Sequence, residues 1–383
     1  MVSVLDCDVA IVGAGPAGSA AALSVLSAAP GLRVVLADSA EFPRDKTCGD
    51  GIAPQVVDLL ATLGVHDVVD GWRPVRRFDV RHGRSSVSRE LRRPMWVIPR
   101  EIFDARLVEH ATSAGAELVR HRVRRVEADG GAVVLDGRLR AKVVIGCDGA
   151  HSTIRSALGH TPPGRRALAV RGYVPLPAAL CGVQRIVFSG RRQPSYAWCF
   201  DRGDGLANVG YGELLERDGR PPSRALFLDR LDALIPGFTE SGVHWRGHHL
   251  PLSSWRWSHP GGRLLLAGDA AGLVNPVTGE GIYYAVRTGM LAGTAAAAAL
   301  GQGEPAGAGD RYARSVRATL AGHFRHVALA ARLFASPALM SAGVRAAARE
   351  QRVFDDFMEI ALAQGTLTGA VLRGVARAGL VAG

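Results

Sequence analysis

Runs of mostly apolar residues alternate along this chain with glycine-rich turns and helical patterns. These runs are 9–12, 33–37, 141–145 and 264–267, and their charged residues are Arg33 and Lys142. A nearly continuous apolar run is typical of a parallel strand that is buried on both faces of a sheet. The segments 19–29 and 281–300 are rich in alanine and are predicted to be helices. Together these segments predict an α/β fold of the Rossmann type.

The middle of the chain has a different pattern. Short strand-like segments alternate with proline and glycine turns over 75–97 and 167–257, with one helical pattern at 223–234. This predicts a mixed or antiparallel sheet inserted into the parallel-sheet domain. We therefore predict a discontinuous nucleotide-binding domain, a substrate domain and a helical C-terminal tail. The first comprises 1–75, 98–166 and 260–305, the second 76–97 and 167–259, and the third 306–383.

The first apolar run leads directly into a complete G-x-G-x-x-G motif. In this motif Gly13 makes the tight turn, Gly15 lets the backbone approach a pyrophosphate, and Gly18 lets the helix pack closely on the strand. Pro16 and Ala17 begin that helix, whose N-terminus favours phosphate. Asp38 follows the second strand, at the position of a ribose-binding carboxylate. The spacing predicts a dinucleotide site, and the alternative is an ordinary parallel-sheet turn.

The charge and the cysteines restrict the partners. The formal net charge is +11, and nearly all basic residues are arginines, since Lys46 and Lys142 are the two lysines. No nucleic-acid motif accompanies this charge, so we expect no nucleic acid and interpret it as an arginine-rich solvated surface. Five cysteines are scattered without metal-ligand spacing, which predicts reduced thiols and no metal site.

The chain has no apolar run long enough to span a membrane and no signal peptide before its first strand. We therefore expect a cytoplasmic protein. The helical segment 370–380 pairs apolar residues with Arg373 and Arg377. It is either an interfacial membrane helix or a helix packed on the body, so peripheral membrane association stays open, as does the oligomeric state.

Three glycine-acid motifs, at 13–18, 146–155 and 268–281, resemble those of the FAD-dependent aromatic hydroxylases and their relatives. The second matches G-x-D-G-x-x-S-x-x-R and the third begins with G-D-A. The resemblance implies FAD as the cofactor. It also implies that Asp148, Gly149 and Asp269 contact FAD, as does Arg100 at a helix start, and that backbone near Val123 meets the adenine. A solvated helix start is the alternative for Arg100.

Further segments are similar to the geranylgeranyl reductase family. They are 43–51, 196–200, 208–212 and 268–282. This resemblance covers roughly residues 5 to 300 and implies reduction of isoprenoid carbon-carbon double bonds. It implies that the flavin ring lies beside the loop containing Pro276, Gly279, Gly281 and Ile282. It also implies that the loop containing Arg44, Lys46, Cys48 and Gly49 covers the flavin, although Lys46 is equally typical of a surface loop.

Reduction of an alkene needs a proton at one carbon as hydride reaches the other. The candidate donors are Cys48, Asp50, Tyr211 and Glu280. A neighbouring Arg44 or Lys46 could shift the pKa of the Cys48 thiol. The alternatives are close packing for Cys48, a loop-closing acceptor for Asp50 and a helix-start residue for Glu280.

Trp198 and Phe200 are candidates to line an apolar cavity for a prenyl chain, with core packing as the alternative. The alternative function is that of an FAD-dependent monooxygenase or halogenase of specialised metabolism. The halogenase signature W-x-W-x-I-P is represented by Trp198 alone. No second G-x-G-x-x-G motif is present, so the electron donor is either transiently bound NAD(P)H or a ferredoxin.

Overall fold

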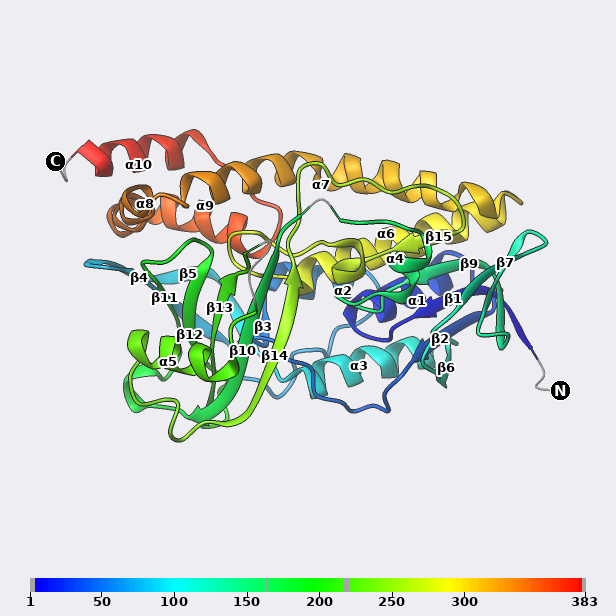
Figure 1. The fold of residues 1–383 in the computed structure, drawn as a ribbon, viewed down its shortest axis with the longest axis horizontal. Coiled ribbons are helices and arrows are strands. Elements are labelled where there is room, and N and C mark those ends of the chain that lie inside the picture. Colours follow the sequence, from blue (N-terminus) through cyan, green and yellow to red (C-terminus); the bar gives the residue numbers. More distant parts are fainter. Residues whose placement is uncertain (1–3, 163, 217–220, 381–383) are drawn as a thin grey trace.

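A computed structural model describes residues 4–162, 164–216 and 221–380. The molecule is elongated, with one sheet towards each end and long helices along one side (Figure 1). The domain ranges predicted above include residues 1–3, 163, 217–220 and 381–383, which lie outside the described residues. We retain that division as a proposal.

The first sheet has the strand order β6-β2-β1-β9-β8-β7, with β15 paired to β9. Its strands β1, β2, β6, β9 and β15 are parallel where they pair, and β7 and β8 form an antiparallel hairpin that continues from β9. The buried parallel strands are the apolar runs of the sequence. The strands are β1 (Leu5–Val12), β2 (Val34–Asp38), β6 (Glu117–Arg120), β7 (Val126–Asp129), β8 (Ala132–Leu135), β9 (Leu139–Gly146) and β15 (Leu264–Leu266).

The second sheet has the order β14-β10-β13-β12-β11-β4-β5-β3 and is antiparallel except for the parallel pair β11 and β4. The predicted mixed sheet is therefore confirmed. Its strands are β3 (Gly51–Ile52), β4 (Val75–His82), β5 (Ser85–Val97), β10 (Arg166–Pro175), β11 (Val183–Phe188), β12 (Ser195–Asp201), β13 (Leu206–Leu214) and β14 (Val243–Pro251).

Small residues let two helices of the first domain approach closely. A Cβ atom added at Gly289 would lie 2.1 Å from the Ala17 carbonyl oxygen, and one at Gly293 would lie 2.3 Å from that of Ala21. The long helix α6 (Ile282–Gly301) therefore packs directly on α1 (Pro16–Ala28). This close packing brings the start of α6 near the start of α1, where the phosphate-binding turn lies. The other helices of the two sheet regions are α2 (Pro54–Ala61), α3 (Arg100–Ser113), α4 (Thr153–Ala157) and α5 (Arg224–Leu234).

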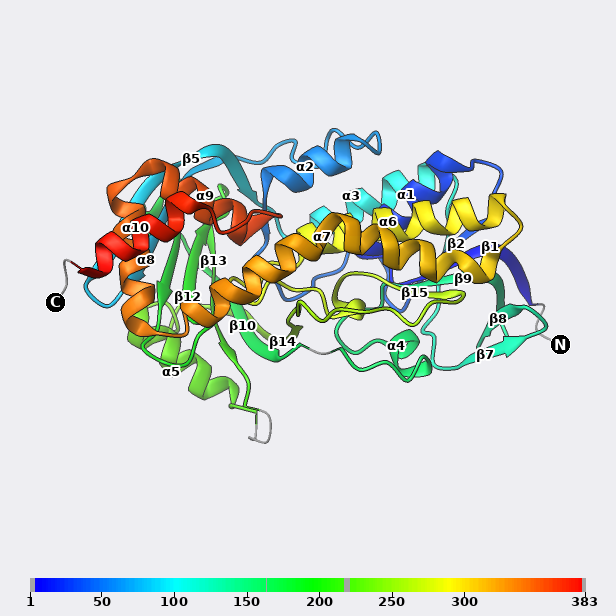
Figure 2. The same cartoon turned by 90° about the horizontal axis from the view of Figure 1, so that it is seen from above.

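The C-terminal helices connect the two halves of the molecule. Helix α7 (Ala308–Leu333) runs from the first sheet to the cluster formed by α8 (Pro337–Arg349), α9 (Gln351–Leu362) and α10 (Gly369–Leu380) (Figure 2). Helices α8 and α9 cover the face of the second sheet, where their apolar residues join those of β4, β5, β11 and β12 in one cluster. The tail is helical, as expected from the sequence.

No single helix among the described residues is long and apolar enough to cross a bilayer. The pair Pro305–Leu333 and Pro337–Arg349, bent by 113° at its break, meets the requirement by length and composition only when the two helices are taken together.

Candidate functional site

A cavity of about 760 Å³ lies between the two sheets and extends under the C-terminal helices. One part of it, which we call the cradle, is lined by the glycine-rich turn, the ends of β2 and β9 and the loop before α6. The other part, which we call the chamber, is lined by the second sheet and by α8 and α9. The chamber residues include Phe78, Val87, Met95, Ile186, Phe188, Trp198, Phe200, Val344, Ala347, Phe354, Phe357 and Met358.

The glycine-rich turn has the geometry that a pyrophosphate requires. Gly13 has a φ of +99°, and a Cβ atom there would lie 2.3 Å from the Cys147 carbonyl oxygen. The first turn of α1 has no side-chain cap on its free N–H groups, so they point towards the cradle. Gly18 packs against the Gly13 carbonyl oxygen behind the turn and allows the helix to approach the strand. These residues fit a dinucleotide diphosphate.

Asp38 supports the same turn from the end of β2. Its carboxylate accepts hydrogen bonds from the backbone N–H of Ala14 at 2.8 Å and of Ala40 at 2.9 Å. Arg44 lies 3.9 Å from this carboxylate and 3.2 Å from that of Asp104. Asp38 and Arg44 therefore lie together at the cradle edge, where a ribose and a diphosphate would bind.

A buried ion pair fixes the predicted FAD-contacting arginine. Arg100 donates to both carboxylate oxygens of Asp104, at 2.6 and 2.7 Å, and it is only 4% exposed. Asp104 in turn accepts the second contact from Arg44. The role of Asp104 could have been found from its i,i+4 spacing to Arg100 on the predicted helix.

The second motif acts as a bridge between distant segments. The Asp148 carboxylate accepts hydrogen bonds from the Ser152 hydroxyl at 2.5 Å and from the Thr153 N–H at 2.6 Å, so it caps α4. Arg155 donates to the carbonyl oxygens of Ala150 at 2.6 Å and of Ala270 at 2.9 Å. The arginine of the second motif therefore holds the backbone of the third.

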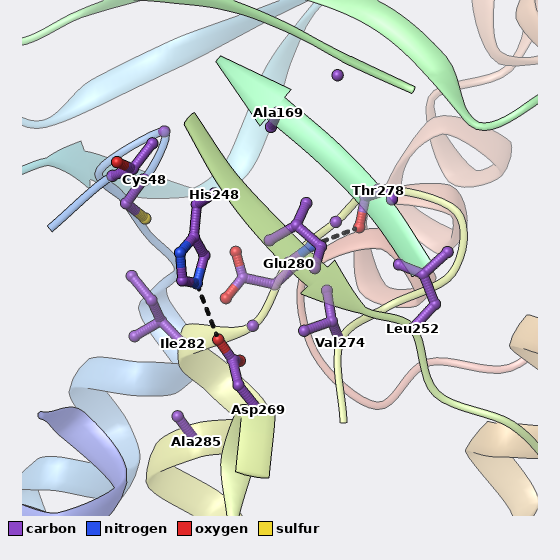
Figure 3. Close-up of a pocket in the computed structure, with 18 of the residues that line it drawn as sticks. Cys48, Ala169, His248, Leu252, Asp269, Val274, Thr278, Glu280, Ile282 and Ala285 are labelled. Atoms are coloured by element: carbon purple, nitrogen blue, oxygen red, sulfur yellow. Dashed lines mark hydrogen bonds and ion pairs between the residues drawn. The ribbon is translucent and has the colours of Figure 1, made fainter. Parts of the chain in front are cut away.

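Charged groups gather around the third motif. The Asp269 carboxylate lies 3.7 Å from Lys46 Nζ and 3.7 Å from His248 Nε2, and Figure 3 shows the second of these contacts. Burial opposes ionisation of Asp269, but Lys46, His248 and Arg100 outweigh burial and lower its pKa to about 2. This carboxylate therefore stays charged and is able to accept a hydrogen bond from a hydroxyl group in the cradle.

Glu280 lies in the same cavity, but its pKa is shifted in the opposite direction to that of Asp269. Burial raises the pKa of its carboxyl to about 7, although the N–H groups of Tyr283 and Ile282 and the charge of Arg100 oppose the change. One carboxylate oxygen accepts a hydrogen bond from the Tyr283 N–H at 3.0 Å, so the residue also starts α6. Figure 3 shows its side chain extending towards His248. Glu280 can hold a proton near neutral pH.

A hydrogen-bond network holds the Cys48 loop on the second sheet. The Cys48 carbonyl oxygen accepts from Asn208 Nδ2 at 2.9 Å and from Arg171 Nε at 3.3 Å. Arg171 also donates to the Lys46 carbonyl oxygen at 3.1 Å and to the Asp45 carboxylate at 2.6 Å. Burial raises the pKa of the Cys48 thiol, and the main opposing charge is that of Arg100. The sequence suggested Arg44 or Lys46 as the cation that acts on this thiol, whereas the structure brings Arg100 to that position.

Asp50 belongs to this network and does not line the cavity. It is fully buried, with a φ of +60°, and one carboxylate oxygen accepts from the Tyr173 hydroxyl and from Asn208 Nδ2, both at 2.7 Å. Burial raises the pKa of this carboxyl to about 6 against the effect of Arg171. Its geometry is that of a loop-closing acceptor.

Most predicted site residues line one cavity, and four do not. Tyr211 lies on the far face of the second sheet, where its ring packs on Phe227 of α5 and its hydroxyl bonds to Ser195 and Glu213. The prediction that Tyr211 donates a proton directly is therefore wrong, because strand alternation turns its side chain away from the cavity. Gly18, Asp50 and Pro276 also lie outside the lining. The lining includes Gly13, Gly15, Pro16, Ala17, Asp38, Arg44, Lys46, Cys48, Gly49, Arg100, Val123, Asp148, Gly149, Asp269, Gly279, Glu280, Gly281, Ile282, Trp198 and Phe200.

Sequence reasoning missed several residues that line the cavity. Trp198 and Phe200 belong to an aromatic row with Tyr196, but His248, Arg171 and Gln184 carried no motif. The contribution of α8 and α9 was also missed, because their apolar faces resemble those of any packed helix. The alternation of cavity-facing residues along β11 is the signal that could have identified Gln184.

The fold and the cradle define an FAD-binding protein of the oxidoreductase type. A family model described as "FAD binding domain" matches residues 6–200, and the second sheet and helical tail complete a fold like that of geranylgeranyl reductases and aromatic hydroxylases. The chain belongs to the geranylgeranyl reductase family of FAD-dependent oxidoreductases.

Three curated relatives are similar over most of this chain. The menaquinone reductase of Mycolicibacterium smegmatis is 34% identical over 74% of this chain and 75% of its own length. The digeranylgeranylglycerophospholipid reductase 1 of Methanopyrus kandleri is 32% identical over 77% and 82%, respectively. The geranylgeranyl diphosphate reductase of Rhodobacter capsulatus is 32% identical over 78% and 77%.

Solved structures share the fold at lower identity. A geranylgeranyl bacteriochlorophyll reductase-like protein from Thermoplasma acidophilum has a TM-score of 0.81 and 20% identity, covering 98% of this chain and 96% of its own. The halogenase PltM, solved with phloroglucinol and FAD, has a TM-score of 0.71 and 15% identity, covering 98% and 91%. The fold is thus shared by enzymes with different chemistries, and fold alone does not select among them.

Proposed function

We propose that this protein reduces carbon-carbon double bonds of a prenyl or isoprenoid substrate, using hydride from reduced FAD. The observation that carries the proposal is the chamber, an apolar extension of the cavity that also contains Asp269, Glu280 and Ile282. Its walls come from the second sheet and from α8 and α9, and most of the side chains are aliphatic or aromatic. Such a wall suits a hydrocarbon chain. The names of the curated relatives support the same substrate class.

The residues of the cradle would hold FAD. The turn from Gly13 to Ala17 would bind the diphosphate, Asp38 a ribose, and Val123 the adenine. Asp269 would accept a hydroxyl of the ribityl chain, and the loop before α6 would lie beside the ring. Bound FAD, once reduced, supplies the hydride.

The chain must provide the proton that completes the reduction. Glu280 is the group best suited to this role, because its carboxyl points into the cavity and its pKa is raised to about 7. Cys48 also lines the cavity and is the second candidate. Asp50 contributes indirectly, since its hydrogen bonds to Tyr173 and Asn208 position the Cys48 loop.

The test is an anaerobic turnover. Enzyme with FAD reduced by dithionite would be incubated with a panel of prenyl lipids, prenylated quinones and prenyl diphosphates, and products analysed by mass spectrometry. Masses higher by two hydrogens support the proposal, and unchanged masses across the panel contradict it. The same panel in air, with oxygen uptake recorded, tests the monooxygenase or halogenase alternative. Replacing dithionite by NADPH, NADH or reduced ferredoxin identifies the electron donor.

Peripheral membrane association is a further part of the proposal, because a prenyl lipid resides in a bilayer. Helix α10 packs on the body through Val371, which is 1% exposed, whereas Leu372 is 49% exposed. Co-sedimentation with liposomes of anionic lipid at low and high salt tests this part independently of turnover. Retention of the protein in the supernatant under both conditions would contradict it.

A further inference from the structure

The amide of Gln184 is a polar group without a partner in the wall of the chamber. Gln184 has no exposed surface, and neither Nε2 nor Oε1 has a hydrogen-bond partner among the described residues. The residue lies on β11, whose alternate residues Gln184, Ile186 and Phe188 line the cavity. Arg185, between them, points to the opposite face and pairs with Asp79 at 2.8 Å. Strand geometry therefore directs the Gln184 side chain to the chamber.

The neighbours of Gln184 in the sheet offer no hydrogen bond from their side chains. Phe200 lies directly opposite on β12, and Phe78 lies opposite on β4. The centroids of these two rings are 6.4 Å apart. A buried amide is normally hydrogen-bonded, because its loss of water is otherwise uncompensated. The unpaired amide among phenyl rings therefore requires an explanation.

A second buried glutamine shows the ordinary arrangement in the same sheet region. Gln193 Nε2 donates to the Ser189 carbonyl oxygen at 2.7 Å, and its Oε1 accepts from the Ser195 N–H at 2.8 Å. Gln193 thus pairs both ends of its amide within the fold. Neither Nε2 nor Oε1 of Gln184 has such a partner among the described residues, so its amide does not stabilise the fold through hydrogen bonds.

The location of Gln184 connects it to the proposed reaction. A Cβ atom added at Gly49 would lie 3.4 Å from Phe200 Cε2, so the Cys48–Gly49 loop lies against the ring that is opposite Gln184. Gln184 is therefore at the loop end of the chamber. A substrate that extends along the chamber from this loop would bring a polar end group to the amide.

We propose that Gln184 binds a hydroxyl or carbonyl oxygen of the substrate inside the chamber. The substrate class is then an isoprenoid with an oxygen-bearing end group, and this group is recognised within the apolar wall. Since the amide has no exposed surface, the ligand oxygen reaches it by displacing an aromatic neighbour. The inference rests on the proposed function, which it deepens by specifying how the substrate is selected.

A stability comparison separates ligand binding from a structural role. Gln184→Leu removes an amide that the fold leaves unpaired, so we expect the thermal midpoint of the ligand-free holoenzyme to stay equal or rise. Gln193→Leu is the matched control, because it removes three hydrogen bonds and is expected to lower the midpoint. A fall for Gln184→Leu as large as that for Gln193→Leu would overturn the proposal.

Binding is measured on the oxidised holoenzyme, so that turnover is not needed. The ligands are geranylgeraniol, the C20 hydrocarbon with hydrogen in place of its hydroxyl, and a naphthoquinone carrying the same prenyl chain. Each is titrated in the same detergent and followed by the flavin absorbance spectrum. We expect the wild type to bind at least one oxygen-bearing ligand about tenfold or more tightly than the hydrocarbon. In Gln184→Leu that ratio should fall to within about twofold, while Val187→Leu, on the opposite face of the same strand, should retain it.

The pattern of results identifies the oxygen that is bound. If Gln184→Leu loses the preference for the alcohol over the hydrocarbon, Gln184 binds a hydroxyl group. If it loses the preference for the quinone over the hydrocarbon, Gln184 binds a carbonyl group. A ratio that is the same in wild type and Gln184→Leu overturns the proposal, even where anaerobic turnover shows prenyl reduction. Failure of all three ligands to bind the wild type overturns this inference, whereas the anaerobic turnover panel decides the proposed function separately.

Discussion

Two carboxyl groups in one cavity are driven in opposite directions by their surroundings. Asp269 faces Lys46 and His248, and its pKa falls to about 2. Glu280 is half-buried and has no cation in ion-pair contact among the described residues, and loss of solvation raises its pKa to about 7. Two acids whose pKa values are driven apart in this way commonly take different roles. The acid with the low pKa is a charged acceptor, and the acid with the raised pKa is a proton donor. This division is the reason that we propose Glu280 as the proton donor.

Replacing Glu280 by glutamine tests that division. The amide oxygen can still accept the hydrogen bond from the Tyr283 N–H, so α6 should begin normally, but no proton can be donated. We expect the rate of reoxidation of the reduced enzyme by substrate to fall about 10²- to 10⁴-fold. For an acid, the wild-type rate should decrease as pH rises through about 7, and the variant should lack that decrease. Stopped-flow flavin absorbance between pH 5.5 and 8.5 measures both effects.

The control for this variant is its flavin content. Equal FAD stoichiometry in wild type and Glu280→Gln would show that the loss is chemical and not a loss of cofactor. If the variant retains both the wild-type rate and the decrease near pH 7, Glu280 is not the proton donor and Cys48 becomes the candidate.

Asp50 makes stability depend on pH. Its carboxyl has a pKa of about 6 in the folded chain, because burial disfavours the charge, against 3.8 for the ordinary group. The folded state therefore binds more protons than the unfolded state between about pH 4 and pH 6, and stability falls as pH rises through that window. The difference amounts to about 3 kcal/mol. Asp50→Asn, which tolerates the left-handed backbone, should remove this contribution.

Chemical denaturation of wild type and Asp50→Asn at pH 4.5 and pH 7.5 measures that contribution. We expect the stability of the variant relative to wild type to increase from the lower to the higher pH. Denaturation curves whose difference does not change with pH would exclude Asp50 as the source.

At the scale of elements, the loop over the cavity is held by the second sheet. Asn208 on β13 accepts a hydrogen bond from Trp198 Nε1 at 2.8 Å and donates to the Cys48 carbonyl oxygen and to Asp50. Asn208→Ala leaves these buried groups without that partner, so we expect a loss of about 2–4 kcal/mol in stability. The loosened loop should also expose Cys48, whose thiol is otherwise unreactive because burial raises its pKa.

Thiol labelling provides the readout for this loop. Cys181 is exposed and should react in both proteins, so it serves as the internal reference. Faster labelling of Cys48 in Asn208→Ala than in wild type would support the role of Asn208 in holding the Cys48 loop. An unchanged Cys48 rate together with unchanged stability would contradict it.

The elements that the sequence predicted well are those with one strong local pattern. The mostly apolar strands and the turn at 13–18 correspond to observed elements, because local sequence determines them. The direction of Tyr211 was missed, since one residue of strand register decides which face it occupies. The lining by α8 and α9 was missed because it depends on tertiary packing over more than 250 residues.

Helix α8 offers a way to test whether the chamber holds substrate. Ala347 is 4% exposed and lines the cavity. Ala347→Phe should fill space in the chamber without reaching the cradle, so we expect kcat/KM to fall about tenfold or more while FAD content is unchanged. Steady-state kinetics with the substrate found in the anaerobic panel measure this. Wild-type kinetics in a folded, flavin-loaded Ala347→Phe would place the substrate elsewhere.

At the scale of the whole molecule, the cofactor site depends on three distant segments that meet at the edge of the first sheet. The three motifs could be found from the sequence because each is a short run of glycines and acids. Their mutual contacts could not be found, because Arg155 binds the carbonyl oxygens of Asp269 and Ala270 more than 110 residues away. Arg155 also does not line the cavity, so no ligand-contact pattern would select it.

Arg155 therefore tests whether assembly of the segments controls cofactor affinity. Arg155→Met removes the guanidinium that joins the second motif to the third, while a side chain of similar length remains. The Ala270 carbonyl loses its 2.9 Å hydrogen bond, and the Asp269 backbone is no longer held for the carboxylate to face Lys46. We expect the dissociation constant of FAD to rise about tenfold or more. We also expect the stabilisation by added FAD to shrink accordingly, since a ligand stabilises only in proportion to its occupancy of the folded state.

Arg263→Met is the matched control, because Arg263 also donates to a backbone carbonyl, that of Lys142 at 3.2 Å, but at an exposed position. Fluorescence of released FAD and thermal midpoints with and without added FAD measure both variants. If Arg155→Met binds FAD as tightly as Arg263→Met, the cradle is assembled by the sheet alone.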